Sequence, residues 1–279
     1  MTGSSEASGA TGREGALEED ALEQVLRERG DSFSEVGIIA EVAPETLRRI
    51  HRCAGYVHGY AGQTTHDQVL SEQMRELIAL THLCAMRDDR FAPNHVRRLY
   101  RLGVADEVII EAAEAIAPAV GHSTVLGVAH AIEQANSDSY PFGAMPEGGR
   151  PKRSTPFPEM NRWPVPAPAS PQATLWPRLA GIDPELVLRY REFLDHCLGS
   201  PEWREPVLGP VPRGLILVPA LAARGSRTLV AVQVERLIGY GVGTRELVEA
   251  VACALPMTGA ATMDEFLEAI EHVDLGGEG

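Results

Sequence analysis

The sequence predicts an all-α fold made of two consecutive repeats, and three observations lead to this prediction. Aromatic residues form only 5% of the 279 residues, so the core must be built from Leu, Val, Ile and Ala, a composition that favours helices. No segment shows convincing period-two alternation of apolar and polar residues, which would indicate a half-buried strand. The two helical regions match each other at one fixed offset, which aligns Arg75 with Arg213.

The matches between the two regions fall in one register without a gap, which indicates a tandem duplication. Core, turn and charged positions all take part. The matched pairs include Arg75 with Arg213, Leu77-Ile78 with Leu215-Ile216, Arg98-Leu99 with Arg236-Leu237, Gly103-Val104 with Gly241-Val242, Glu111-Ala112 with Glu249-Ala250, Pro118 with Pro256 and Gly121 with Gly259.

The elements are expected in the following order. Residues 1–32 form an acidic tail with a short docking helix, and residues 33–136 form the first repeat. Helices are expected from a Pro-Glu first turn at residue 44, over 72–86, up to Gly103, over 106–117 and over 123–135. The proline-rich residues 137–175 form an extended linker, because so many prolines exclude helix and central strand. Residues 176–274 form the second, degenerate repeat.

Composition excludes several classes of function. A formal net charge of −14 argues against nucleic-acid partners and anionic membrane surfaces. Lys152 is the single lysine, which excludes pyridoxal chemistry and P-loop nucleotide hydrolysis. The chain has no apolar run that could span a bilayer, and its first residues lack the pattern of a signal peptide, so a cytoplasmic location is expected.

Cysteine and histidine spacing gives no sign of a metal or a redox dithiol. The four cysteines, Cys53, Cys84, Cys197 and Cys253, lie far apart and are expected to be reduced core thiols. Seven of the nine histidines fall in the first repeat, but none has a metal-ligand spacing with a nearby carboxylate. We therefore expect no metal site.

The string LSEQMRELIALTHLCAM, followed by NHVRRLYRLGVADEVIIEA, resembles the carboxymuconolactone decarboxylase and alkylhydroperoxidase D-like family. The resemblance covers about residues 36–136 and, more weakly, 179–274. In the redox branch of that family a glutamate is followed by a Cys-x-x-Cys pair and a histidine. The corresponding positions here are Glu76, Asp88, Phe91 and His95. Both redox cysteines are replaced, which argues against peroxidase activity.

By this resemblance, His95 is the expected general acid/base, Glu76 orients it or shares its proton, and Asp88 is a third polar candidate. Pro93 is tolerated only in a first helical turn, so a helix is expected to begin near Ala92 and to leave Asp88 in a loop or cap. For Glu76 and His95 the alternative is an ordinary surface charge or a satisfied core residue. The candidates for substrate binding are Phe91, His82, His122, Arg75 and Arg98.

The second repeat lacks these acid/base residues, because the fixed offset places Gly214, Ser226, Leu229 and Gln233 at the four positions. It is therefore interpreted as a scaffold half. Arg213 is kept there although the acid/base pair is lost, so a structural salt bridge is the better account of its counterpart Arg75.

The sequence thus predicts a cofactor-independent lyase or isomerase, decarboxylase-like, acting on a carbonyl- or lactone-containing small molecule such as a polyketide-type biosynthetic intermediate. The alternatives are a non-catalytic, oligomeric small-molecule-binding or scaffold protein and a residual thiol peroxidase that uses Cys84. Relatives form rings of six such repeats, so a homo-oligomer, a trimer by analogy, is expected.

Overall fold

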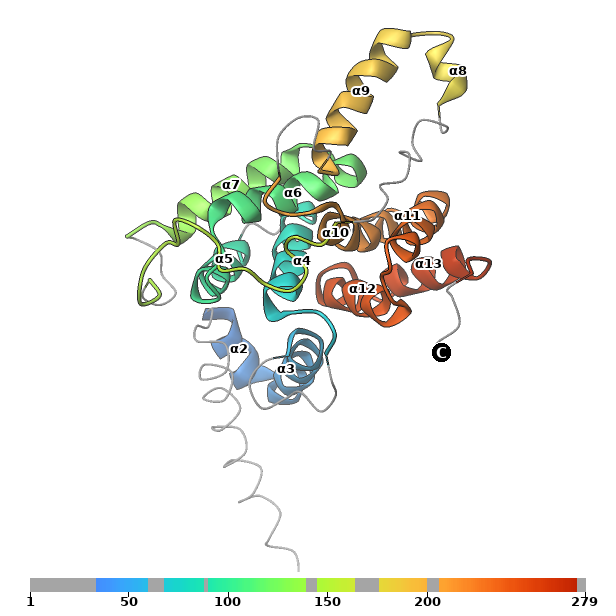
Figure 1. Ribbon diagram of the computed structural model, residues 1–279. Helices are drawn as coiled ribbons and strands as arrows, with labels where there is room; N and C mark the ends of the chain where they lie inside the picture. The colour runs from blue at the N-terminus through green and yellow to red at the C-terminus, as the bar shows by residue number, and fades with distance from the viewer. Residues whose placement is uncertain are drawn as a thin grey trace, which may run out of the picture. The chain divides into compact units, whose positions relative to one another are not determined.

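The computed structural model describes residues 34–59, 68–87, 90–138, 145–163, 176–199 and 206–274 (Figure 1). All regular elements within these ranges are α-helices, which confirms the all-α prediction. The chain divides into two compact units, one of residues 1–67 and 140–144, the other of residues 68–139 and 145–279. Helices of both expected repeats thus lie in the second unit. The expected tail and docking helix in residues 1–32 lie outside the described residues.

Two helices, α2 (Ser34–Val42) and α3 (Pro44–His58), form the described part of the first unit. The proline that opens α3 occupies the first turn, where the N–H that it lacks would have no partner within the helix. α3 ends at Gly59, whose φ of 72° is the left-handed conformation that favours glycine. Val36 and Leu47 pack together as a small apolar core of this helix pair.

The first half of the second unit consists of α4 (Glu72–Ala85), α5 (Ala92–Arg101), α6 (Asp106–Val120) and α7 (Ser123–Ala135). The central helix is α4, which is buried from Met74 through Cys84 and packs against the other three. α6 continues through Pro118, past the end expected at residue 117. The proline removes one helical hydrogen bond, but the neighbouring bonds hold the last turn together.

The second half consists of α8 (Pro177–Ala180), α9 (Pro184–Cys197), α10 (Pro210–Ala223), α11 (Arg227–Gly239), α12 (Thr244–Thr258) and α13 (Ala261–Ile270). Here α10 takes the central place: it is buried from Val211 through Ala222 and packs against α6, α11, α12 and α13. The pair α8–α9 stands at the edge of this half, where α9 packs on α6 (Figure 1).

Two helices of each half have boundaries that follow the same fixed offset that aligns the sequences. Both the first and the last residue of α10 are the sequence counterparts of those of α4, and the same holds for α12 and α6. Gly103 and Gly241 have left-handed φ values of 75° and 77°, and each ends the helix before it. These equal spacings support our proposal that the chain is a tandem duplication.

Two reciprocal ion pairs join the halves. Arg213 on α10 places Nη2 2.8 Å from Oε2 of Glu111 on α6. Its counterpart, Arg75 on α4, places Nη1 3.7 Å from Oε1 of Glu249 on α12. All four side chains are buried or nearly so. Each half therefore supplies one arginine from its central helix and one glutamate to the other half.

Each of these glutamates also accepts two backbone hydrogen bonds from the segment that precedes its partner's helix. Glu111 accepts from the N–H groups of residues 207 and 208, at 3.3 and 2.6 Å. Glu249 accepts from the N–H groups of residues 69 and 70, at 2.8 and 3.2 Å. The buried carboxylates are thereby satisfied by both charge and hydrogen bonding, which a buried charge requires.

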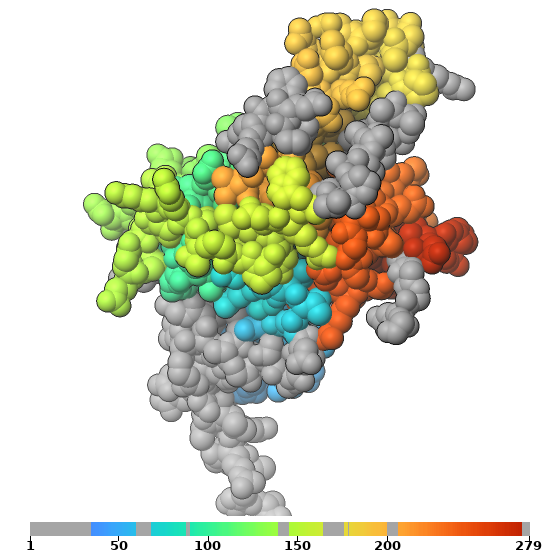
Figure 2. Space-filling view, in the orientation of Figure 1, coloured from blue at the N-terminus to red at the C-terminus, as the bar shows by residue number. Residues whose placement is uncertain are grey.

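The described part of the proline-rich linker, residues 145–163, forms neither helix nor strand and lies across both halves (Figure 2). Glu159 accepts hydrogen bonds from the N–H and the hydroxyl of Ser71 at the start of α4, at 2.8 and 2.6 Å. Arg162 pairs with Glu246 of α12. The carbonyl of Met160 accepts the N–H of Gly209 before α10. We call residues 145–163 the strap.

None of the helices in the described ranges has the length and hydrophobicity needed to cross a bilayer.

Candidate functional site

α4 carries Glu76 into the interior of the first half. The helix is buried on nearly every side, so this carboxylate has only 1% of its side chain exposed. A carboxylate is stable at such a position only when neighbouring groups pair with it or bond to it. Two side chains of α5 do so.

α5 begins at Ala92, as the position of Pro93 predicted, because the proline fits the first turn of the helix. His95 therefore lies in the first turn, and its Nδ1 is 2.7 Å from Oε2 of Glu76. Arg98 follows three residues later on the same helical face, with Nη1 3.1 Å from Oε1 of Glu76. The carboxylate thus contacts the imidazole through one oxygen and the guanidinium through the other.

This geometry assigns different roles to the two ring nitrogens of His95. With the imidazole neutral, Nδ1 carries the hydrogen and donates it to the Glu76 carboxylate, so Nε2 holds the lone pair. Nε2 makes no hydrogen bond to any residue in the described part of the chain. The side chain of His95 is 15% exposed. Nε2 is therefore the atom available for proton exchange with a bound molecule.

The sequence did not reveal that Arg98 pairs with Glu76. Its side chain is 12% exposed, so the ion pair is shielded from water and its attraction is stronger than at the surface. We expected Arg98 only as a substrate-binding residue. The i+3 spacing of Arg98 from His95 indicates that both lie on one face of a helix. That spacing alone does not show which residue of another helix Arg98 contacts.

The other sequence candidates lie in different places. Asp88 lies outside the described residues. Phe91 is the residue immediately before α5, one helical turn ahead of His95. His122 is exposed in the turn between α6 and α7 and makes no hydrogen bond or ion pair to the Glu76–His95 pair. Arg75 contacts Glu249 in the ion pair between the halves, in agreement with a structural role.

His82 is a core residue of α4. It is 1% exposed, and its Nδ1 lies 2.8 Å from the carbonyl oxygen of Ile78, so Nδ1 donates to that carbonyl. Burial lowers the pKa of His82 to about 4. The imidazole is therefore neutral at pH 7. Its Nε2 has no hydrogen-bond partner among the described residues.

Asn94, next to His95, is a polar residue that the sequence analysis missed. It is 7% exposed, and its Oδ1 has no hydrogen-bond partner among the described residues. A buried amide oxygen without a partner is uncommon and marks a place where a ligand or water can bind. No sequence pattern distinguishes this asparagine, because its burial depends on helices that are distant along the chain.

None of the four cysteines, all of which lie in the described residues, forms a disulfide bond. Cys84 is 5% exposed, and Cys253 is fully buried on α12. Burial raises the pKa of the Cys253 thiol; the Arg75 charge opposes this, and the Glu249 and Glu76 charges raise it further. Cys253 is therefore a neutral thiol, unsuited to nucleophilic chemistry.

Among the described residues, no group of three or more His, Cys, Asp or Glu side chains is arranged to hold a metal ion. The chemistry that the site itself can supply is proton transfer by an imidazole that a buried carboxylate orients.

A search of curated proteins finds no match to this chain. Residues 54–134, the segment that contains Glu76, Asn94, His95 and Arg98, match the carboxymuconolactone decarboxylase family.

Proposed function

We propose that the chain is a cofactor-independent enzyme that transfers protons on a small molecule containing a carbonyl or lactone group. The leading reaction is decarboxylation. The observation that carries this proposal is the 2.7 Å contact between buried Glu76 and Nδ1 of His95, which leaves Nε2 available to a substrate. The family match of residues 54–134 supports chemistry of the decarboxylase kind.

In the proposed reaction the bond between the substrate carboxylate and its neighbouring carbon breaks. The electron pair of that bond moves into the conjugated carbonyl, CO₂ leaves, and an enolate or dienolate forms. The His95 imidazolium then gives its Nε2 proton to carbon, and water restores that proton. The net change consumes one proton and replaces the carboxylate with hydrogen, so charge and atoms balance.

Glu76 stabilises the imidazolium while His95 carries the extra proton, because the two charges lie in hydrogen-bond contact. Arg98 shares the negative charge of Glu76. The carboxylate can therefore orient the ring in both protonation states without holding the proton permanently. We assign Glu76 and Arg98 as positioning residues and His95 as the catalytic residue.

The second half supports the proposal that His95 and Asn94 face the substrate. Its cavity is lined by Val232 and Gln233, and the fixed offset between the halves makes these the counterparts of Asn94 and His95. The same positions that face a cavity in the second half therefore carry a buried amide and an imidazole in the first half. Asn94 is the residue we propose to hydrogen-bond a polar group of the substrate.

The experiment offers the purified chain a set of carboxylated lactones and vinylogous β-keto acids and follows CO₂ release. We expect His95→Ala to reduce release about 10²–10⁴-fold, the usual contribution of a positioned acid/base group. Glu76→Gln keeps a hydrogen-bond acceptor for Nδ1 but removes the charge, so it is expected to shift the pH profile as well as reduce the rate. Equal release by wild type and His95→Ala would overturn the proposal.

The alternative is a binding protein without chemistry. It predicts that ligands of the set bind to wild type and His95→Ala but are recovered unchanged from both. Analysis of the recovered ligand by mass spectrometry separates the two proposals directly.

A further inference from the structure

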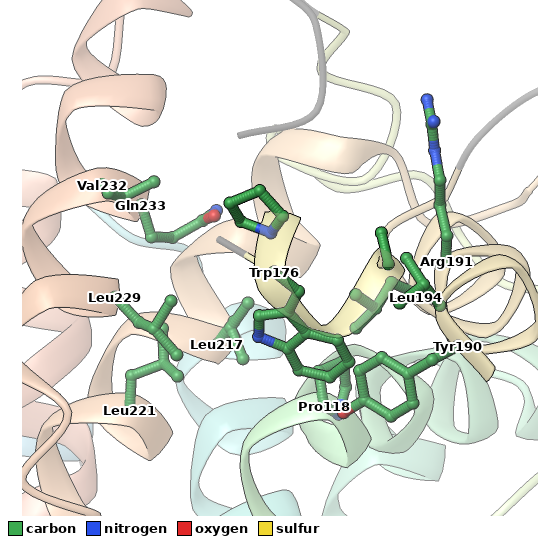
Figure 3. Close-up of a pocket in the computed structure, with 13 residues that line it drawn as sticks. Pro118, Trp176, Tyr190, Arg191, Leu194, Leu217, Leu221, Leu229, Val232 and Gln233 are labelled. Carbon is green, nitrogen blue, oxygen red and sulfur yellow. The ribbon is translucent and has the colours of Figure 1, made fainter. Parts of the chain in front are cut away.

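The second half contains a cavity of about 190 Å³ between the α8–α9 pair and the helices α10 and α11 (Figure 3). Pro118 of α6 closes one side. α9 packs on α6 and α8, and its residues that line the cavity lie opposite residues of α10 and α11. The cavity lies entirely within the second unit and contains neither Glu76 nor His95.

Most of the lining is aliphatic or aromatic. Leu217 and Leu221 from α10 and Leu229 from α11 face Val187 and Leu194 from α9. At one side the rings of Trp176 and Tyr190 stack, with centroids 4.8 Å apart. Apolar cavities of comparable volume accept small aromatic molecules, because such a ligand restores the contacts that the empty space lacks.

Gln233 is the polar group deep in this cavity. It is 3% exposed, and its side-chain amide makes no hydrogen bond to another described residue. Figure 3 shows this amide directed toward the cavity from α11. An amide that faces an apolar cavity favours a ligand that can form a hydrogen bond with it. Arg191, in contrast, is exposed at the edge, 3.8 Å from Asp195.

The cavity has no acid/base group of the kind seen in the first half. Gln233 occupies the position of His95, and Gly214 the position of Glu76. A Cβ at Gly214 would lie 2.6 Å from Nε2 of Gln233 and 2.7 Å from Cδ2 of Leu237, so the ends of both side chains would have to shift. A side chain at position 214 would thus displace the Gln233 amide from its present place.

We propose that this cavity is a second, non-catalytic ligand site. It binds an uncharged molecule with one or two aromatic rings and one hydroxyl or carbonyl group, which forms a hydrogen bond with Gln233. The rings contact the leucines of α10 and α11 and the Trp176–Tyr190 stack. The site is independent of the proposed proton transfer in the first half.

The test uses 1-naphthol as the probe and the full chain as the protein, with affinity measured by titration calorimetry. We expect saturable binding with one site per chain. Leu229→Trp fills the cavity from a half-buried position and is expected to weaken binding at least 10-fold. Gln233→Leu is expected to weaken the binding of 1-naphthol about 5-fold, because one hydrogen bond is lost. Naphthalene, which cannot form that hydrogen bond, is expected to bind the variant as well as wild type.

His95→Gln is the matched control in the first half and leaves 1-naphthol affinity unchanged while it removes the proposed activity. This control separates failure of the second site from failure of the proposed function. Thermal unfolding identifies variants that do not fold, and Val187→Phe supplies a second filled cavity from α9. Absence of 1-naphthol binding, or equal affinity in wild type, Leu229→Trp and Val187→Phe, would overturn the proposal.

Discussion

The two halves of the second unit share a helical arrangement and differ in one buried cluster. In the first half, Glu76 contacts His95 and Arg98. In the second half the corresponding residues are Gly214, Gln233 and Arg236, and Arg236 donates instead to the hydroxyl of Tyr240 at 2.6 Å. The helices and the ion pairs between the halves therefore do not need the acid/base cluster. This difference fits our proposal that the cluster serves chemistry rather than folding.

The largest expected effect on stability tests whether the ion pairs that join the two halves are essential for folding. Arg213→Met removes the charged partner of Glu111. The side chain of Glu111 is 0% exposed, so its carboxylate would stay buried without that charge. Removing one member of a buried ion pair typically costs about 3–5 kcal/mol. Chemical denaturation measures the loss of unfolding free energy.

Arg75→Met is the matched control for Arg213→Met. Its ion pair is longer, at 3.7 Å, and less buried, so we expect a smaller loss. Equal losses would show that the two reciprocal pairs are energetically equivalent, and no loss from Arg213→Met would contradict their role in joining the halves.

A second difference between the halves predicts a pH dependence of stability. His82 of α4 has Ala220 as its counterpart on α10. Burial lowers the pKa of His82 to about 4 from 6.5, so the unfolded chain binds this proton at higher pH than the folded chain does. The contribution of neutral His82 to the free energy of unfolding is therefore complete above pH 6.5. About 3 kcal/mol of this free energy is lost as pH falls from 6.5 to 4.

Unfolding of wild type and His82→Leu across this pH range measures the effect. The variant is expected to lose that part of the pH dependence while other groups still titrate. Identical slopes in the two proteins between pH 6.5 and 4 would contradict the buried, neutral state of His82.

Gly214 tests whether Gln233 and Leu237 can accommodate a side chain at this position of α10. Gly214→Ala places a Cβ against Gln233 and Leu237, so overpacking is expected to cost about 1–3 kcal/mol, offset in part by better helix propensity. Thermal unfolding measures the change. Glu76→Ala is the counterpart in the first half, where no overpacking arises. A more stable Gly214→Ala protein would show that Gln233 and Leu237 move aside without strain.

The strap gives the smallest expected effect. Glu159 accepts two hydrogen bonds from Ser71 at the first-half helix α4, whereas at α10 in the second half the acceptor is the backbone carbonyl of Met160. Glu159→Gln keeps the shape but removes the charge, so about 1–2 kcal/mol is expected to be lost. Hydrogen exchange is expected to show faster opening at the start of α4 than at the start of α10; equal changes at both helices would contradict the difference.

The sequence predicted the helices well because apolar periodicity, Pro93 and the glycines at 103 and 241 act locally. The contact between Glu76 and His95 followed from motif spacing in a resembling family, not from local chemistry. The pairing of Arg98 with Glu76 and the burial of Asn94 depend on how α4 and α5 pack, which one sequence does not encode in a visible pattern. The ion pairs between the halves had a signal: Arg75, Arg213, Glu111 and Glu249 are all kept across the repeats.

The cavity could not be predicted, because its lining comes from five helices and the residue before α8, and its volume depends on the gap beside α9. α6 extends past the predicted end at residue 117 because Pro118, near the end of the helix, interrupts only one helical hydrogen bond.

The central claim is that proton transfer resides in the first half alone. Deuterium incorporation from D₂O into a carbon acid of the proposed substrate class measures that transfer directly, even when no CO₂ is lost. We predict that His95→Gln, which installs the residue found in the second half, lowers incorporation about 10²–10⁴-fold while Gln233→Ala leaves it unchanged. Equal incorporation by wild type and His95→Gln would contradict the account.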